Sequence, residues 1–287
     1  MAERDGDGWA RCDQGHLHWG RFGAVGLLGY AGDRDDVAVL LARRSRWSQH
    51  GGSWGPPGGA RDSDEDPVDA ALREAAEECD LPPGGVRIEA MLLDDHGGWS
   101  YRTYVAAAAA LFPVRAASPE ISDARWVSAV EVASLRLHPG FARHWPALSR
   151  ALVPVTIIVD AANVMGARPD GWWRDRAGAA LRLHAQLVSL AGRGIATLPG
   201  TLGLPPLDLW FPDFTLVVEG AARGAGFGRD DRVRVVAAPG SGDDAIVAQA
   251  RALPGRRLVV TADRELRRRC EAAGAVVTGP GWLLGLL

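Results

Sequence analysis

Lysine is absent from this 287-residue chain, and all 32 of its basic residues are arginine. Cysteine is scarce: Cys12, Cys79 and Cys270 are far apart and odd in number, so they fit neither a disulfide framework nor a zinc knuckle. We therefore expect reduced, mostly structural thiols. No apolar run approaches the roughly 18 residues of a membrane helix, and the polar, acidic N-terminus lacks a signal pattern. The sequence predicts a cytoplasmic protein without a membrane partner.

The residues that are present are typical of a globular protein, with 47% hydrophobic and 23% charged side chains. The length suits two α/β domains better than one small core. Charge is distributed unevenly: residues 1–150 carry 16 arginines against 22 acids, whereas residues 151–287 carry 16 against 13. The acidic first half suits a cation-binding enzyme, and the mildly basic second half permits a polyanionic ligand.

The first half alternates strand-like and helical patterns. Strands are expected over Ala24–Leu28 and Val37–Ala42, followed by a glycine-rich loop and a helix over Pro67–Cys79. The run Ala106–Ala110 is ambiguous, because alanine favours a helix but the flanking residues favour a buried strand at least as strongly. We interpret Tyr101–Leu111 as a strand.

A new pattern starts after Pro154. Val155–Val159 is a β-branched run, and the strands that follow alternate with helices, which is typical of a parallel sheet covered on both faces. The boundary falls near residues 150–154. We therefore predict an α/β protein with two domains, residues 1–152 and residues 153–287.

The densest chemical signal lies on the helix expected at Pro67–Cys79. Glu74, Glu77 and Glu78 are spaced i, i+3 and i+4, so their carboxylates share one side of the helix, where each like-charged pair costs about 0.2–0.5 kcal/mol. Arg73 lies to one side and does not neutralise all three. A hard divalent cation, Mg²⁺ or Mn²⁺, would do so. The alternative is a solvated acidic face. The stripe expected to be buried is Val68, Ala71, Leu72, Ala75 and Cys79.

The wider spacing resembles the Nudix box, G-x5-E-x7-R-E-U-x-E-E-x-G-U, in which U is a bulky aliphatic residue. Gly59, Glu65, Arg73-Glu74, Glu77-Glu78 and Leu81 occupy the matching positions. Two positions depart: Ala75 is smaller than the usual aliphatic residue, and Asp80 replaces the final glycine. A left-handed backbone is common just past a helix end, and aspartate tolerates it, so we expect lower stability at Asp80 rather than lost chemistry.

The resemblance, which covers roughly residues 20–150, implies a Nudix α/β/α sandwich with a mixed sheet. It implies a pyrophosphohydrolase acting on a nucleoside diphosphate linked to another group: a nucleoside triphosphate, a nucleotide derivative or an RNA 5′ end. In that family the glutamates of this segment bind metal together with the carbonyl of the box glycine. Carried over, the metal-binding and catalytic residues are Glu74, Glu77 and Glu78, with Gly59 as a further metal ligand. Arg73 and Glu65 are expected to form an ion pair that orients the loop.

Substrate contacts are less determined. Trp54 and Arg73 are the substrate-binding candidates in this half. Aromatic residues that either stack a base or pack in the core or a loop are Trp47, Trp54, Trp99 and Tyr101. Glu120 and Asp123 are each either a further catalytic acid or part of a polar loop. His16 and His18 alternate as strand residues do, and we favour packing over metal binding for them.

The second half contains acids at the ends of its expected strands. Asp160 ends the β-branched run with Asn163 just after it, Asp243-Asp244 follow a Gly-Ser-Gly segment, and Asp263 follows the strand at Leu258–Thr261. Because the carboxyl ends of parallel strands face the ligand crevice, these acids could hold one or two metal ions for phosphodiester cleavage. Asp243 and Asp263 alternatively cap helices.

The pieces IIVDAANV, SGDDAIV and VVTADRELR resemble the NYN domains of the PIN-like nuclease superfamily. The resemblance implies a Rossmann-like parallel sheet and a metal-dependent ribonuclease. Catalytic metal ligands would be Asp160, Asp243 (or Asp244) and Asp263, supported by Asn163. Two further acids, Glu219 and Asp175, are also explained as a surface residue and the start of a helix.

Arginines follow Asp263 in a short basic run, in which Arg264 is a candidate contact for an RNA backbone, although such runs are usually solvated faces. The partners expected are therefore a nucleotide substrate and RNA. The rival interpretation is a binding protein in which one or both sites sense a ligand without turnover. The sequence leaves open whether the chain forms a homo-oligomer.

Overall fold

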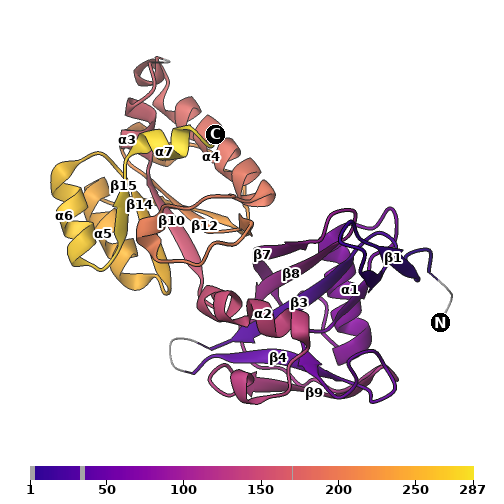
Figure 1. Cartoon of the computed structure of the whole chain (residues 1–287). Coiled ribbons are helices and arrows are strands. Elements are labelled where there is room, and N and C mark those ends of the chain that lie inside the picture. The colour runs from indigo at the N-terminus through magenta and orange to yellow at the C-terminus, as the bar shows by residue number, and fades with distance from the viewer. Residues whose placement is uncertain (1–3, 33–35, 170) are drawn as a thin grey trace. The chain divides into compact units, whose positions relative to one another are not determined.

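The computed structural model describes residues 4–32, 36–169 and 171–287 (Figure 1). The chain divides into two compact units. The first unit comprises Met1–Leu152 with Pro205–Asp208, and the second comprises Val153–Leu204 with Leu209–Leu287. Within the described residues, no helix combines the length and the apolar character needed to cross a membrane.

A mixed sheet forms the centre of the first unit. Strand β3 (Ala24–Ala31) pairs in parallel with β8 (Ser100–Ala107), and β8 pairs antiparallel with β7 (Arg87–Asp95). At its start β3 also pairs antiparallel with β6 (Gly58–Ala60). Every residue of β3 is buried, so this strand is the core of the unit. The mixed α/β character expected from the sequence is confirmed.

Further strands extend the sheet from the end of β3. Strand β4 (Ala38–Arg44) pairs antiparallel with β3, with β5 (Trp54–Gly55) and with β9 (Ile121–Ser128). Helix α2 (Pro139–Leu148) follows β9 after a short 3-10 turn at Val132–Ser134. A separate hairpin is formed by two short antiparallel strands, β1 (Trp9–Arg11) and β2 (Leu17–Trp19).

Strand β8 ends earlier than the sequence suggested. The expected strand over Tyr101–Leu111 is wrong in its last residues, because β8 stops at Ala107 and residues 108–110 are irregular. The reason is pairing: Ala107 lies opposite Tyr30, and β3 itself ends one residue later at Ala31. Without a partner strand, the remaining alanines have no ladder to join.

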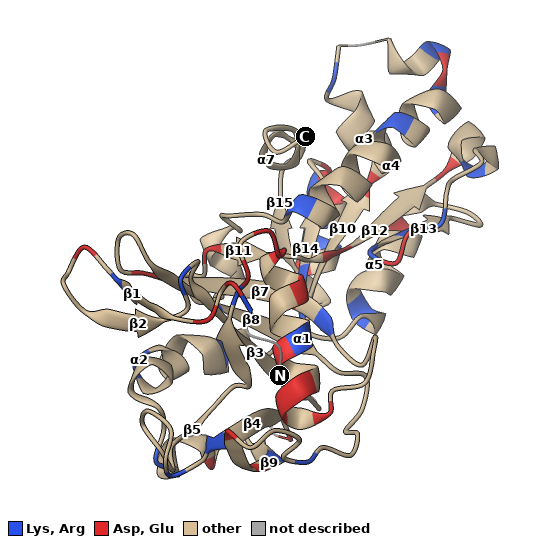
Figure 2. Cartoon of the chain, turned by 90° about the vertical axis from the view of Figure 1, so that its right-hand side faces the viewer, with Lys and Arg blue, Asp and Glu red and all other residues tan. Residues whose placement is uncertain are grey.

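Helix α1 (Pro67–Cys79) packs on β3 and β6, and its acidic residues are red in Figure 2. Its ends follow the sequence: the Asp66 side chain accepts the Val68 N–H, and Asp80 adopts the left-handed conformation with φ 61°. The expected buried stripe needs a correction. Val68 and Leu72 are only partly buried, whereas the sites fully packed against the sheet also include Ala70 and, unexpectedly for an acid, Glu78.

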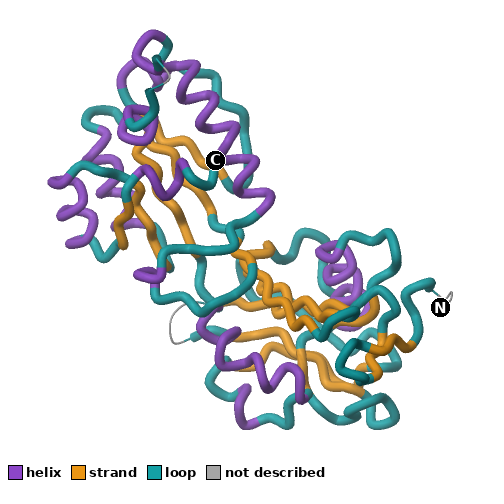
Figure 3. The backbone as a smooth tube through the Cα atoms, turned by 45° about the horizontal axis from the view of Figure 1, so that its top comes forward, coloured by secondary structure: helices purple, strands orange, loops and turns teal. Residues whose placement is uncertain are grey.

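The second unit is built on a five-stranded parallel sheet in the order β13-β12-β10-β14-β15. Helices lie on both sides of these strands (Figures 1 and 3), so the parallel sheet expected for this half is confirmed. The strands are β10 (Val155–Asp160), β12 (Asp213–Val218), β13 (Val233–Ala237), β14 (Arg256–Val260) and β15 (Val276–Thr278). The helices are α3 (Ala161–Gly166), α4 (Arg176–Arg193), α5 (Gly242–Ala252), α6 (Arg264–Ala272) and α7 (Pro280–Leu284).

Strand β10 is buried along its whole length because it contacts two hydrophobic cores. Ile157 belongs to the core that includes Leu183 of α4, and Ile158 belongs to the core that includes Ile246 of α5 and Leu266 of α6. The strand order reverses between β10 and β14, which is where parallel α/β sheets open a crevice at the carboxyl ends of their strands.

Candidate active sites

Glu78 is the most buried acid of α1, with 7% of its surface exposed. Its Oε2 accepts the backbone N–H of Gly58 at 2.9 Å. Burial raises the pKa of Glu78 to about 8; the Gly58 hydrogen bond opposes this, and the charge of Glu74 adds to it. An ionised carboxylate at this place therefore needs a positive partner.

Glu74 lies against the next residue of the same strand. A Cβ atom on Gly59 would be only 2.6 Å from Oε2 of Glu74, so any larger residue there would push this carboxylate away. Burial raises the pKa of Glu74, while a hydrogen bond from Arg73 opposes the shift. The Gly58–Gly59 segment thus brings the backbone of β6 next to two partly desolvated carboxylates.

Glu77 is placed differently from the other two glutamates. It lies 2.7 Å from Arg4 and 3.6 Å from Arg73, and its side chain remains 38% exposed. The sequence predicted that the three carboxylates lie together. In the structure, those of Glu74 and Glu78 lie at β6, whereas that of Glu77 forms ion pairs with arginines. Arg4, near the start of the chain, is a participant that the sequence pattern did not indicate.

The guanidinium of Arg73 is hydrogen-bonded to the acids around it. Its Nε and Nη2 donate to the two oxygens of Glu65 at 2.6 and 2.8 Å, and Nη1 donates to Glu74 at 2.6 Å. Hydrogen bonds from Arg73 also lower the pKa of Glu65. The ion pair has the form expected from the sequence. Arg73 does not line the cavity described below, so its geometry supports a positioning role and not substrate contact.

These residues fit a divalent cation by an observation independent of resemblance. Burial raises the pKa values of both Glu74 and Glu78, and a neighbouring carboxylate adds to each shift: Glu77 to that of Glu74, and Glu74 to that of Glu78. Carboxylate oxygens are the ligands preferred by Mg²⁺ and Mn²⁺, and a doubly charged ion would reverse both shifts. The glutamates and the backbone carbonyl of Gly59 are the oxygens that would hold it.

A cavity of about 390 Å³ opens beside this acidic site within the first unit. Gly58, Gly59 and Glu78 line one part of it, and Tyr101 and Arg44 line another. The hydroxyl of Tyr101 occupies the space above Gly26 and Gly58, where added Cβ atoms would lie 2.2 and 3.0 Å from it. The cavity therefore brings together the basic residue Arg44, the acid Glu78 and the aromatic residue Tyr101.

Histidines form another part of the cavity wall. His50 and His138 have ring centroids 4.7 Å apart, and both line the cavity. Burial lowers the pKa of His138 to about 4, with the charges of His50 and Arg44 contributing, so His138 is neutral at physiological pH. Its Nδ1 accepts the Gly140 N–H at 3.3 Å, which leaves the proton on Nε2.

The aromatic residues considered for base stacking differ in their exposure and in whether they line the cavity. Trp99 and Tyr101 line the cavity, whereas Trp47 is 70% exposed outside it. Trp54 is 6% exposed, carries the Arg125 guanidinium 4.7 Å from its ring centroid, and does not line the cavity. The prediction that Trp54 contacts substrate is therefore not supported by its position, because packing in β5 covers the ring.

The two candidate loop acids, Glu120 and Asp123, differ in their position relative to the acidic site. Glu120 is among the charges that raise the pKa of Glu78, so its carboxylate is near the acidic site. Asp123 lies on β9 opposite Arg43 and is not among the main charges behind that shift. Glu120 is thus the better-placed further acid.

In the second unit, Asp160 is held at the carboxyl end of β10. It is 8% exposed, and its two oxygens accept the Asn163 N–H at 3.0 Å and the Thr261 hydroxyl at 2.9 Å. The Asn163 side chain accepts the Ala262 N–H at 2.9 Å, which ties the loops after β10 and β14 together. Burial raises the pKa of Asp160, with the charges of Asp243 and Glu219 adding to the shift.

Four acids line a second cavity, of about 610 Å³: Asp160, Glu219, Asp243 and Asp263. Burial, then the charge of Asp263, raises the pKa of Asp243. Asp263 also caps α6 by accepting the Leu266 N–H, whereas Asp243 lies inside the first turn of α5, so the capping alternative for Asp243 is wrong.

The remaining candidates in this unit lie outside that cavity. Asp244 forms an ion pair with Arg269, which favours Asp243 as the residue of the pair that faces the site. Asp175 caps α4 through the Gly178 N–H, as the alternative interpretation held. Arg264 begins α6 as an exposed residue and does not line the cavity.

Comparison with known proteins identifies the first unit. Residues 20–150 match the model of the NUDIX domain. Over 160 residues the chain is 44% identical to the putative 8-oxo-dGTP diphosphatase 3 of Mycobacterium tuberculosis, covering 53% of this chain and 72% of that protein. The chain belongs to the Nudix hydrolase family. The second unit lies outside the residues matched by the family model.

Two further Nudix proteins are similar over about half of the chain. A nucleoside triphosphate pyrophosphatase/Nudix hydrolase fusion protein of Bifidobacterium longum is 35% identical over 157 residues, covering 51% of this chain and 32% of that protein. The crystal structure of the Nudix hydrolase RenU of M. smegmatis is 40% identical, covers 51% of this chain and 94% of that one, and has a TM-score of 0.48.

Proposed function

We propose that the first unit is a Mg²⁺- or Mn²⁺-dependent pyrophosphohydrolase that converts nucleoside triphosphates into the monophosphate and pyrophosphate. The observation that carries this proposal is the placement of Glu74 and Glu78 on the Gly58–Gly59 segment at the edge of a nucleotide-sized cavity. The name of the mycobacterial relative makes 8-oxo-dGTP the first substrate to test. Nucleotide derivatives and RNA 5′ ends are the alternative substrates.

Each residue of the acidic site has a defined task in this reaction. Glu74, Glu77 and Glu78 would hold the cation, which when bound would neutralise phosphate charge and make the attacking water more acidic. Arg73 orients Glu74 and Glu65 through its forked donors, and the Gly58 N–H orients Glu78. Glu120, whose charge raises the pKa of Glu78, is the candidate to accept a proton from the attacking water.

The rest of the cavity suits a nucleotide. Arg44 lines it and its charge influences the pKa values of Glu78 and His138, which supports Arg44 as the residue that contacts the phosphates. The neutral His138 offers an Nε2–H donor to a base carbonyl. Tyr101 lines the cavity and is the aromatic candidate for contact with a base ring.

The test is a substrate panel with Mg²⁺, comprising 8-oxo-dGTP, unmodified triphosphates, dinucleotide cofactors, sugar nucleotides and 5′-triphosphate or capped RNA. Release of pyrophosphate or phosphate should depend on metal and fall by about 10³-fold or more in Glu77→Gln, in line with the loss of charge stabilisation at a catalytic centre. The exposed Glu131→Gln is the matched control. Tight nucleotide binding without turnover of any substrate would establish the sensor alternative instead.

A second candidate function belongs to the second unit, where we propose a metal-dependent ribonuclease of the NYN type. Its support is the cavity lined by Asp160, Glu219, Asp243 and Asp263 at the end of a parallel sheet. Asp160→Asn should abolish RNA cleavage and keep RNA binding, with the exposed Asp231→Asn as control. RNA binding without cleavage by the unmodified protein, in Mg²⁺ or Mn²⁺, would exclude the nuclease.

A further inference from the structure

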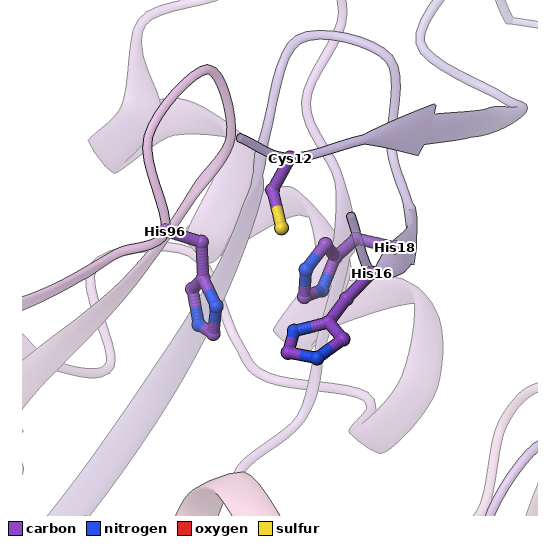
Figure 4. A group of neighbouring side chains, drawn as sticks. All are labelled: Cys12, His16, His18 and His96. Carbon is purple, nitrogen blue, oxygen red and sulfur yellow. The ribbon is translucent and has the colours of Figure 1, made fainter. Parts of the chain in front are cut away.

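The first unit contains a group of metal-type donors that the acidic site does not use. Cys12, His16, His18 and His96 each offer one ligand atom, and these four atoms all lie within 4.8 Å of one another. Figure 4 shows the sulfur of Cys12 directed into the space between the ring of His96 and the rings of His16 and His18. One sulfur and three nitrogens form a ligand set that differs in kind from the glutamate oxygens.

The β1–β2 hairpin supplies three of these donors. The Cys12 N–H donates to the His16 carbonyl at 3.0 Å, and the Gly15 N–H donates to the Cys12 carbonyl at 2.9 Å, so a tight turn holds these residues together. His18 follows His16 by two residues on β2, and its side chain also reaches the group. Backbone hydrogen bonds therefore hold together the segment with the spacing C-x3-H-x-H.

The turn between β7 and β8 supplies the fourth donor, His96. The Asp13 N–H donates to the Gly97 carbonyl at 2.9 Å and joins this turn to the hairpin. Gly97 and Gly98 have φ values of 72° and 68°, a conformation that glycine adopts readily. A Cβ on Gly97 would also lie 2.6 Å from Oδ2 of Asp13, so a larger residue there would displace the Asp13 side chain.

Two nitrogens of the group are buried and have no hydrogen-bond partner among the described residues: His18 Nε2 and His96 Nδ1. Leaving such an atom unpartnered costs about 1–3 kcal/mol. The other ring nitrogen of His96 lies 3.3 Å from Oδ2 of Asp94. A carboxylate that accepts the second N–H is the usual support of a metal-ligating histidine, because it leaves the opposite nitrogen with a free lone pair.

The chemistry of the donors selects the ion. Cys12 is a free, buried thiol, 3% exposed, that packs with Ala24 and Trp99. Thiolate with imidazole suits Zn²⁺, whereas Mg²⁺ prefers oxygen. Tetrahedral zinc with bonds of roughly 2.0–2.3 Å would separate its donors by roughly 3.3–3.8 Å, so side-chain rotations that draw these atoms in by about 1 Å complete the site.

We propose that Cys12, His16, His18 and His96 bind a structural Zn²⁺, with Asp94 as the hydrogen-bonded support of His96. Four protein ligands leave no open position, so this ion is structural and does not activate water. Its role is to fasten the β1–β2 hairpin to the β7–β8 turn. Because the three histidines line the same cavity as Glu78, the zinc ion would stiffen one wall of the nucleotide site.

The full chain, purified without chelators and dialysed with excess Mg²⁺ to occupy oxygen sites, should retain about one zinc ion per chain by elemental analysis. Replacement by Co²⁺ should give the visible spectrum of a tetrahedral site with a thiolate-to-metal charge-transfer band. Cys12→Ser should lose the charge-transfer band, and His96→Gln should lose most of the bound metal. Asp94→Asn should bind zinc about 10- to 100-fold more weakly.

Two controls separate this site from other metal binding. Cys270→Ala, which removes a buried thiol of the second unit, and Glu77→Gln, which changes the acidic site, should both keep the zinc and the cobalt spectrum. The proposal is overturned if the unmodified protein, with Cys12 reduced, takes up cobalt without a charge-transfer band. It is equally overturned if Asp94→Asn and His96→Gln bind zinc as the unmodified protein does, which would leave the stacking of His18 on Trp99 (4.0 Å) as packing alone. The wild-type spectrum and Asp94→Asn decide the question even if Cys12→Ser does not fold.

Discussion

Without a divalent cation, the first unit should lose stability as the pH rises, because Glu78 then has to ionise inside the protein. Its pKa of about 8 in the folded state lies above the ordinary value of 4.5. Between these two values the folded state binds more protons than the unfolded state, so the free energy of unfolding falls with increasing pH and levels off above pH 8. Full ionisation corresponds to about 5 kcal/mol, of which about 3.5 kcal/mol develops between pH 5 and pH 8.

Glu78→Gln is the perturbation that isolates this effect. The amide keeps an acceptor for the Gly58 N–H but has no charge to bury, so the variant should be more stable than the unmodified protein at pH 8 in the presence of a chelator. The difference should shrink toward pH 5. Amide exchange of the fully buried strand β3, corrected for its intrinsic pH dependence, reports unfolding of this unit separately from the second. The exposed Glu131→Gln should show no such trend.

Adding Mg²⁺ should make the unmodified protein more stable than Glu78→Gln. The cation stabilises the ionised glutamates of the unmodified protein, with a gain that grows with pH, and should have little effect on Glu78→Gln. A stability difference between the two proteins that stays constant from pH 5 to pH 9 would refute the reasoning, since it would show that Glu78 does not titrate in the folded state within this window.

Three further predictions follow from the same region. Arg44→Ala should raise the KM for a nucleoside triphosphate by about 10- to 100-fold with a smaller change in kcat, the effect of losing one charged hydrogen bond to phosphate, measured by pyrophosphate release. Glu120→Gln should lower the pKa of Glu78, so that Mn²⁺ affinity measured calorimetrically keeps its strength to lower pH, whereas Asp123→Asn should not change that profile. Asp80→Gly should stabilise the first unit by about 0.5–1 kcal/mol, measured by thermal unfolding. Glycine adopts the left-handed backbone at φ 61° without strain, and the exposed ion pair between Asp80 and Arg115 that the variant loses contributes little. A destabilised variant would contradict this.

Much of the acidic helix could be predicted from sequence because its features are local. Pro67 at the first turn and the left-handed Asp80 after the last one depend on residues only a few positions apart. The buried stripe was predicted less well. Val68 and Leu72 were expected in it by hydrophobicity, but they are partly buried, whereas the small Ala70 is fully buried.

The sequence by itself determined the membership of one family, the spacing of Glu74, Glu77 and Glu78, and the parallel sheet of the second unit, because each depends on patterns of residues that are close together in the chain. Only the tertiary structure decided that Glu78 is buried on Gly58, that Glu77 faces Arg4, and that Arg44 lines the cavity. It alone also brings His96 to Cys12. Such contacts join segments far apart in the chain, and no periodicity encodes them, because they result from how the strands pair and how closely glycine lets their backbones approach.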